Sequence, residues 1–428
     1  MIIEGLFVHH DRIERHQVAC TFKRSTRHSI PLIQKVAHKI GTADLIFNDD
    51  ALIFPAFIDI HVHARDDIGK KESYKEDFNS LSLAAINGGV FAVVDMPNNL
   101  TAPPINQINY KQKLKLVHDL NLNSNSNSNS KIAVALYAGI TRDSNPFIMD
   151  ESNVPYKYFF NSSPQIQITE EIISRYKNQQ ITFHAEDANY FLPGPELSND
   201  KHYKHYKHHE VRSEEAEIRA IKEIIKLTIK YNLKTIIAHV STVEGVKLCQ
   251  QAKKEGLNLK LEVCFHHLLL NHEEHPEKYF QVNPPLRSKK TQRAMLDFII
   301  DKNSPLYSPF DYLVTDHAPH TFEEKMKGIS GFPGLDTYGL MAAYLIKEKG
   351  VDPTLISRLS SYNPGKFFNY FQNSDEKIFL GKIEENYHAK FTVMDFSKKT
   401  LIDKNFIQSK CKHSPYNGME VNAKVFLV

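Results

Sequence analysis

The sequence lacks a cysteine framework, a long apolar run and an excess of charge of one sign. Its four cysteines, Cys20, Cys249, Cys264 and Cys411, form no CxxC pair, which argues against a disulfide frame and favours a reducing compartment. No run approaches the roughly 18 apolar residues of a membrane helix, and no secretory signal is visible. We therefore predict a cytoplasmic protein with no membrane partner.

The charge balance bears on the choice of partner. Lys and Arg number 53 and Asp and Glu number 50, a formal net charge of +3 without a strong block. Nothing therefore indicates a surface that follows phosphates, and we expect a small-molecule substrate rather than nucleic acid. A chain of 428 residues with 41% hydrophobic content can form one large domain, or one large and one small.

Short apolar runs rich in β-forming residues alternate with helical patterns, which is typical of βα units around a parallel sheet. Eight such runs occur, at residues 57–63, 90–96, 132–137, 156–160, 181–184, 235–240, 259–264 and 312–316. The clearest helix is expected over 213–231, where four isoleucines and Thr228 share one face. This α/β pattern predicts a (β/α)8 TIM-type barrel, and an open doubly wound sheet is the alternative.

The two ends of the chain do not follow the βα pattern. Residues 1–54 and 376–428 carry short strand-like runs without long helices, and we predict that they form one small β-sandwich domain beside a barrel of residues 55–375. Two biased tracts, NSNSNSNS (123–130) and KHYKHYKHH (201–209), are expected to be loops. The histidines of the second tract alternate with lysines that would repel a cation, so we interpret it as a solvated loop.

Histidine is abundant, with 22 residues, and several lie where strands of the predicted barrel end. In such barrels the chemistry sits at the C-terminal ends of the strands. The residues concerned are His61, His63, His184, His239 and Asp316. Any one histidine alone is more often a hydrogen-bonded or exposed side chain, but together these residues predict a divalent metal site of the kind zinc accepts.

Two neighbouring metal ions need an anion between them, because cations about 3.5–4 Å apart repel each other. The strand at 156–160 offers no carboxylate, but it contains one charged residue, Lys157. Burying an ammonium is costly. We interpret Lys157 as an amine that captures carbon dioxide and becomes a bridging carbamate, and the alternative is a lysine that reaches out of the barrel rim. Cys264 is interpreted as core packing.

A series of motifs runs from about residue 50 to 340 in a consistent order. The motifs are FIDIHVHAR (57–65), DMPNN (95–99), HAE (184–186), AHVST (238–242), EV and HHL (262–263 and 266–268), NPPLR (283–287), TDHAPH (315–320) and GFPGLD (331–336). On these motifs the chain resembles the amidohydrolase superfamily and, within it, the dihydroorotase family of cyclic amidohydrolases. In the resembled pattern Cys264 and Phe265 stand where Thr-Pro is frequent.

The resemblance implies a set of site residues. Two divalent metal ions, Zn²⁺ above all, would be held by His61, His63 and Asp316, by His184 and His239, and by a bridging carbamylated Lys157. The substrate carboxylate would be held by Arg65, Asn98 and His320, and the substrate ring would be contacted by Asn283 and by backbone near Gly331.

The implied activity is the reversible cyclisation of N-carbamoyl-L-aspartate to L-dihydroorotate and water in de novo pyrimidine biosynthesis. Hydroxide between two metal ions is a nucleophile at neutral pH, and Asp316 would act as general base and then as general acid. Arg65 would give a bidentate clamp for the carboxylate.

Two alternatives stay open at this point. A hydantoinase, dihydropyrimidinase or allantoinase shares the metal ligands, although Arg65 just after the HxH motif favours a ring that bears a carboxylate. A non-catalytic amidohydrolase-fold paralogue typically loses metal ligands, and here all six are present. The sequence leaves open whether the chain forms a homodimer and what the loop at Ser162 and Ser163 does.

Overall fold

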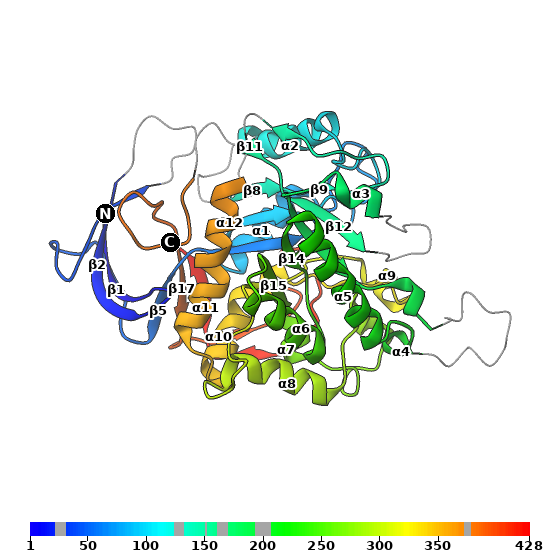
Figure 1. Ribbon diagram of the computed structural model, residues 1–428. Helices are drawn as coiled ribbons and strands as arrows, with labels where there is room; N and C mark the ends of the chain where they lie inside the picture. The colour runs from blue at the N-terminus through cyan, green and yellow to red at the C-terminus, as the bar shows by residue number, and fades with distance from the viewer. Residues whose placement is uncertain (22–30, 124–131, 150–151, 161–169, 193–206, 372–377) are drawn as a thin grey trace.

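The computed structural model describes residues 1–21, 31–123, 132–149, 152–160, 170–192, 207–371 and 378–428 (Figure 1). Three features singled out in the sequence lie outside the described residues: 124–130 of the NSNSNSNS tract, Ser162 with Ser163, and 201–206 of the KHYKHYKHH tract.

Eight parallel strands form the centre of the molecule. Their order begins with β6 (Phe57–Val62), β7 (Val90–Asp95) and β8 (Ala133–Leu136). It continues through β9 (Ala138–Gly139), β12 (Tyr156–Phe160), β13 (Gln180–Ala185), β14 (Lys234–Ile237), β15 (Leu259–Cys264) and β16 (Tyr312–Val314). Only Tyr137 separates β8 from β9, so these two segments act as one barrel strand.

The barrel closes between its first and last strands. Val62 at the end of β6 bridges His317 in parallel, and the N–H of His63 donates to the carbonyl of His317 at 2.8 Å. An open doubly wound sheet has no such link, so that alternative is wrong. The α/β barrel predicted from the sequence is confirmed.

Helices surround the strands in Figure 1. The longer ones are α1 (Phe78–Asn87), α2 (Gln107–Asn123), α5 (Glu214–Tyr231), α6 (Val243–Lys254), α8 (Lys289–Ile300), α10 (Tyr338–Lys349) and α12 (Asn363–Phe371). The shorter ones are α3 (Glu170–Ser174), α4 (His208–Val211), α7 (Phe265–Leu269), α9 (Phe322–Met326) and α11 (Pro353–Ser357), with single turns at Ala188–Tyr190, Lys278–Phe280, Leu335–Thr337 and Arg358–Tyr362. Helix α5 confirms the helix expected over 213–231, with Ser213 as its N-cap and Ile221 and Ile224 buried.

A seven-stranded sheet joins the two ends of the chain. Its members are β1 (Ile2–Val8), β2 (Ile13–Thr21), β3 (Leu32–Ala37), β4 (Leu45–Ile46), β5 (Ala51–Pro55), β17 (Phe391–Asp395) and β20 (Lys424–Leu427). β17 pairs antiparallel with β5, so the C-terminal strands extend an N-terminal sheet, and both termini lie on this side of the barrel in Figure 1. The small β domain built from both ends is thus confirmed as part of the fold class, while its boundaries stay a prediction.

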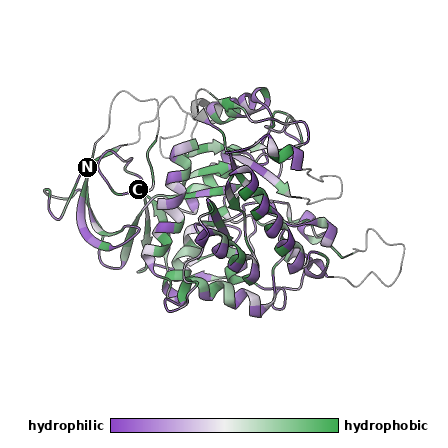
Figure 2. Ribbon diagram, in the orientation of Figure 1, coloured by the Kyte–Doolittle hydropathy of each residue, from purple (hydrophilic) through white to green (hydrophobic). Residues whose placement is uncertain are grey.

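The remaining short strand pairs are β10 (Ile148–Met149) with β11 (Ser152–Asn153) and β18 (Thr400–Leu401) with β19 (Glu420–Val421). Hydrophobic residues concentrate in the barrel strands, whereas the surrounding helices alternate between hydrophobic and hydrophilic residues (Figure 2). Strands β6 and β7 are buried along their whole length, as expected for a parallel sheet covered on both faces. Among the described helices, none is long and apolar enough to cross a bilayer.

Candidate active site

The first cluster of predicted metal ligands forms where β6 and β16 end. The Oδ1 atom of Asp316 lies 3.2 Å from Nε2 of His61 and 3.1 Å from Nε2 of His63. All three side chains are buried. Two imidazoles and one carboxylate therefore converge on one point inside the barrel mouth.

The outward nitrogens of the two imidazoles are both engaged. Nδ1 of His61 lies 2.7 Å from Oε2 of Glu262, and Nδ1 of His63 lies 2.7 Å from Oδ1 of Asn98. Burial raises the pKa of Glu262 to about 8, and a divalent cation beside His61 would favour its ionised form. With Nδ1–H donating to these oxygens, each Nε2 presents a lone pair toward Asp316, the arrangement that metal-binding histidines show.

The second cluster joins β13 and β14. Nδ1 of His184 lies 3.0 Å from Nε2 of His239. Nε2 of His184 is 2.9 Å from Oε2 of Glu186, and the same oxygen accepts from Arg212 at 2.6 Å. The carboxylate of Glu186 thereby fixes the proton of His184 on Nε2, which leaves Nδ1 facing His239. Nδ1 of His239 is buried without a hydrogen-bond partner.

The two clusters form a continuous site. The ring centroids of His61 and His239 are 5.2 Å apart, and ligand atoms of His61, His239 and Asp316 all lie within 4.8 Å of one another. Burial is the main cause that lowers the pKa of each of the four histidines, His61, His63, His184 and His239, so the rings are neutral, as metal binding requires.

Lys157 of β12 points into this site. Its side chain is 1% exposed, and its Nζ has no hydrogen-bond partner among the described residues. Burial lowers the pKa of Lys157 to about 8, with Glu262 and Asp316 opposing the shift. Its charge in turn lowers the pKa of His61, His184 and His239, so the amine lies among the predicted ligands. A lysine that reaches out of the barrel rim, the alternative considered from the sequence, is therefore wrong.

The donor set fits a pair of divalent cations. Two zinc ligands at a tetrahedral angle lie roughly 3.3 Å apart, and the three pairs of facing ligand atoms here are 3.0, 3.1 and 3.2 Å apart. The buried Nζ of Lys157 has no hydrogen-bond partner among the described residues. All other donors are imidazole nitrogens and a carboxylate, which are borderline and hard ligands.

Unusual backbone angles direct several of these side chains. Arg65, His239 and Asp316 have φ values of 56°, 36° and 48°, in the left-handed region that residues other than glycine seldom adopt. Each of the three lies two or three residues beyond the end of a barrel strand. Such strain is typical of functional sites that the surrounding structure holds in place.

A buried carboxylate supports the turn that carries Asp316. Asp59 of β6 accepts hydrogen bonds from the hydroxyl of Thr315 at 2.5 Å and from its N–H at 3.2 Å. Asp59 also accepts from the N–H of His61 at 3.1 Å. One side chain therefore links the first metal-site strand to the last.

The residues expected to hold a carboxylate meet beside the first cluster. A terminal N–H of Arg65 donates to Nε2 of His320 at 3.1 Å, and Nδ1 of His320 donates to Glu324 at 3.2 Å. Nε of Arg65 is buried and has no hydrogen-bond partner in the described part of the chain. A guanidinium with an unused buried donor is suited to an anionic ligand. His320 has its proton on Nδ1, so in this arrangement it orients Arg65.

The residues expected to contact the ring come from two adjoining loops. Oδ1 of Asn283 lies 2.9 Å from Nε2 of His208, and the Asn283–Pro284 peptide bond is cis. The N–H of Gly331 donates to the carbonyl of Gln281 at 3.1 Å. Gly331 has φ of 133°, and a Cβ there would lie 2.5 Å from the carbonyl oxygen of Ala318. A side chain at this position would therefore strain the backbone and crowd the Ala318 carbonyl.

Sequence reasoning missed several residues that touch the predicted site. Glu262 and Glu186 support His61 and His184, and both lie in motifs that were recognised without a role being given to them. The described part of the KHYKHYKHH tract was interpreted wrongly. His208 and His209 begin α4 and are half-buried, because Arg212 anchors this helix to Glu186.

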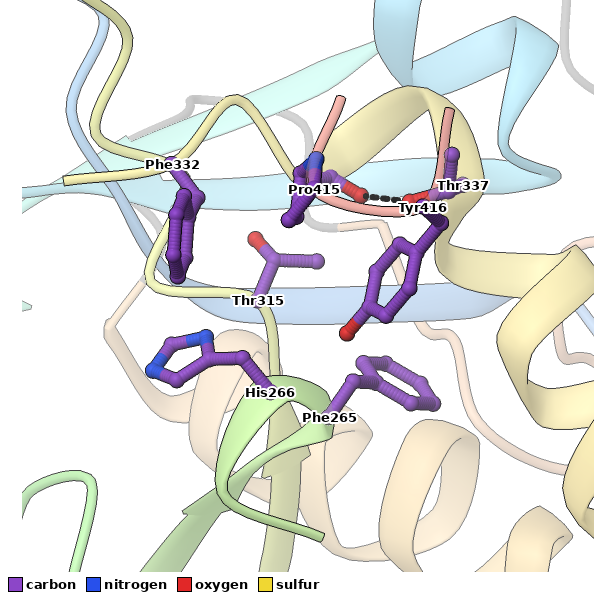
Figure 3. A pocket seen from close by; sticks show the side chains of 8 residues that line it. Phe265, His266, Thr315, Phe332, Thr337, Pro415 and Tyr416 are labelled. Carbon is purple, nitrogen blue, oxygen red and sulfur yellow. Dashed lines mark hydrogen bonds between the residues drawn. The ribbon is translucent and has the colours of Figure 1, made fainter. Parts of the chain in front are cut away.

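A small cavity lies beside Thr315, the residue before Asp316 (Figure 3). It measures about 10 Å³, and Figure 3 shows Tyr416 and His266 directed toward it from opposite chain segments. Such a volume suits one water molecule and excludes a substrate. Cys264, His266 and His267 form another buried group whose ligand atoms lie within 4.8 Å of one another. Cys264 is buried in the barrel core cluster, in line with the packing role inferred from the sequence.

A protein-family model and several curated proteins match this chain in sequence. The Amidohydrolase family model matches residues 52–425. The dihydroorotase of Thermoplasma acidophilum is 33% identical over 383 residues, covering 87% of this chain and 81% of that protein. The dihydroorotase of Thermococcus kodakarensis is 30% identical, covering 92% of this chain and 86% of that protein.

Solved structures agree in fold at lower identity. The dihydropyrimidinase of Brevibacillus agri superposes with a TM-score of 0.79 at 17% identity, covering 99% of this chain and 92% of that one. The L-hydantoinase of Arthrobacter aurescens gives a TM-score of 0.79 at 20% identity, with 99% and 93% covered. At such identity these likenesses establish the barrel and its β domain.

Proposed function

The chain belongs to the amidohydrolase family, and we propose that within this family it is a dihydroorotase. It interconverts N-carbamoyl-L-aspartate and L-dihydroorotate plus water, a step of de novo pyrimidine biosynthesis. One observation carries the choice of substrate: the guanidinium of Arg65 lies beside the metal-type cluster with a buried, unused Nε donor, where a ring carboxylate would be bound.

The proposed cofactors are two divalent ions, Zn²⁺ in our assignment. His61, His63 and Asp316 would hold one, His184 and His239 the other, and a carbamylated Lys157 would join them. When bound, such ions lower the pKa of water and polarise a carbonyl oxygen. The neutral state favoured by the burial of Lys157 is the form of an amine that reacts with carbon dioxide.

Asp316 would move the proton. Its carboxylate lies 3.1 Å from Nε2 of His63 and 3.2 Å from Nε2 of His61, and a cation held by these residues would keep it ionised and able to accept a proton. In the hydrolytic direction Asp316 takes a proton from the attacking water and delivers it to the ring nitrogen that leaves. In the synthetic direction the same carboxyl takes a proton from the ureido nitrogen as this nitrogen attacks the side-chain carboxyl carbon, and passes it to the hydroxyl that departs as water.

The remaining site residues would orient the substrate. Arg65 binds the carboxylate, with Asn98 and His320 beside it, while Asn283 and the backbone at Gly331 contact the ring. The Oδ1 atom of Asn98 already accepts from His63, which leaves its amide N–H groups for the ligand. Donation from His320 to a carboxylate requires its other tautomer.

An ultraviolet assay tests the activity. Metal-replete protein should hydrolyse dihydroorotate and close N-carbamoyl-aspartate, with little turnover of dihydrouracil, hydantoin or allantoin. A preference for the rings that lack a carboxylate would contradict the proposed function and favour the activities named for the structural neighbours. Absence of all turnover in metal-replete protein would favour a non-catalytic paralogue.

Metal analysis and intact mass test the cofactors. The wild-type chain should bind two zinc ions and carry a carbon-13 carbamate signal in bicarbonate buffer. Lys157→Met should lose that signal and most activity, whereas Lys226→Met, a change at an exposed helix position, should keep both. Zinc binding by the wild type without a carbamate would refute the bridging role.

We further propose a cytoplasmic location, which the four free cysteines support, and the division into residues 1–54, 55–375 and 376–428. A homodimer stays a prediction that sedimentation would test.

A further inference from the structure

His208 binds two acceptors with a single ring nitrogen. Its Nε2 lies 3.1 Å from the carbonyl oxygen of Val282 and 2.9 Å from the side-chain oxygen of Asn283. A backbone carbonyl can only accept, so Nε2 must carry the proton. The side-chain atom of Asn283 that faces His208 is then also an acceptor, which identifies it as the amide oxygen.

This hydrogen bond decides which end of the Asn283 amide is free. Because Oδ1 is occupied by His208, the two N–H groups on Nδ2 are left for another acceptor. The Asn283 loop adjoins the Gly331 loop through the Gly331–Gln281 hydrogen bond. The free donors of Asn283 therefore belong to the part of the site assigned above to the substrate ring, whose carbonyl groups are acceptors.

A second asparagine of the site is held by a histidine in the same way. Asn98 is held through its Oδ1 by Nδ1 of His63 at 2.7 Å, which likewise leaves its amide N–H groups for a ligand. The two substrate-side asparagines are thus each oriented by one histidine. His63 is also a predicted metal ligand, whereas His208 has no role in the metal clusters.

The helix that carries His208 is anchored independently of Asn283. Arg212, one residue beyond α4, donates to Glu186 at 2.6 Å, and its carbonyl accepts from Arg287 at 2.7 Å. His209 stacks on His272 with ring centroids 3.6 Å apart. His208 is therefore presented to Asn283 from a support that is fixed on both sides.

We propose that His208 is a positioning residue for substrate recognition, which fixes the Asn283 amide with its N–H groups directed to the carbonyl groups of the substrate ring. The inference rests on the proposed function, because it assigns Asn283 to the ring of dihydroorotate. It names a residue from the histidine-rich tract that sequence reasoning had interpreted as a solvated loop.

The test compares variants of His208 with a neighbouring control. His208→Leu removes the donor and should raise KM for dihydroorotate about threefold to tenfold, the range for one hydrogen bond, with kcat within twofold. His208→Gln places an N–H donor at a similar reach and should keep KM within threefold of wild type. His209→Leu removes the stack on His272, but the two hydrogen bonds of Arg212 still hold α4, so KM should stay within twofold of wild type.

A double-mutant cycle with Asn283→Ala separates positioning from general damage. In that background His208→Leu should change kcat/KM by less than twofold, because the amide it orients is gone. Circular dichroism and metal content establish that each variant is folded and loaded, and His208→Met replaces His208→Leu if the latter does not fold.

Three results would overturn the proposal: a normal KM for His208→Leu, an equal loss in His209→Leu, or a full effect of His208→Leu in the Asn283→Ala background. Failure of the proposed function is a separate result, since the wild type would then not turn over dihydroorotate at all.

Discussion

The metal side and the substrate side of the site are held by different means. The proposed metal side comprises His61, His63, Lys157, His184, His239 and Asp316, which are all buried and lie in barrel strands or within two residues of one. The proposed substrate side comprises Arg65, Asn98, Asn283, His320 and Gly331, which lie on loops, and Asn98 is exposed. The backbone of the first group is thus held in or beside paired strands, whereas the second group depends on hydrogen bonds between loops.

This difference separates the residues proposed for catalysis from the residues proposed for substrate recognition. Barrel strands place ligand atoms reproducibly, since each strand is paired on both sides. Loops can vary while the strands stay the same. We therefore expect damage to the metal side to remove turnover of every substrate, and damage to the substrate side to change affinity and preference.

The largest effect is expected from Asp316→Asn, which breaks the metal side. This change removes a ligand and the proton acceptor together, and kcat for dihydroorotate should fall by about 10³-fold or more. Zinc content should fall as well, measured by atomic emission. Asp49→Asn, at an exposed carboxylate of the terminal sheet, serves as the control and should keep full activity. A variant with near-normal kcat would remove Asp316 from the mechanism.

Arg65→Gln breaks the substrate side. Loss of the charged fork should raise KM for dihydroorotate about 100-fold, while the metal content stays that of the wild type. Arg65→Lys keeps the charge without the bidentate geometry and should give an intermediate KM. Steady-state kinetics and zinc analysis on the same samples measure KM and metal content. Unchanged kinetics would count against a substrate that bears a carboxylate.

Glu186→Gln should weaken zinc binding at only one of the two proposed metal positions. The carboxylate of Glu186 accepts from His184 and Arg212, and an amide cannot accept equally from both. Affinity for one of two zinc ions should fall about 10–100-fold, measured by competition with a chelator. Glu223→Gln, on the exposed face of α5, is the matched control. Equal loss of both ions would contradict two separate positions.

The smallest effect is expected from Gly331→Ala. A Cβ at this residue meets the Ala318 carbonyl, and the backbone has φ of 133°, so unfolding free energy should fall by about 1–3 kcal/mol. Gly350→Ala has φ of 71° with open space around the added atom, and it should lose only about 1 kcal/mol. Thermal melts measure both losses. A KM change confined to Gly331→Ala would link this strain to the substrate side.

The sequence predicts the metal side better than the substrate side. Strand ends can be located by periodicity, so His61, His184 and Asp316 were recognisable by position alone. Arg65, Asn283 and His320 were identified only by resemblance, since loop conformations depend on contacts across the fold. Glu186 and His208 were given no role in the site. Glu186 lies two residues from His184, but their hydrogen bond depends on the fold, and His208 meets Asn283 from 75 residues away in the sequence.

The pairing of β5 with β17 also has a consequence for the order of synthesis. Residues 51–55 leave the ribosome long before residues 391–395. One edge of β5 is therefore unpaired during this time, and Ile53 and Phe54, which are buried in the folded protein, are uncovered. The nascent chain therefore has an unpaired, aggregation-prone strand edge while the barrel is translated. Chaperone occupancy of this segment, followed on stalled ribosomes, should end only when β17 emerges.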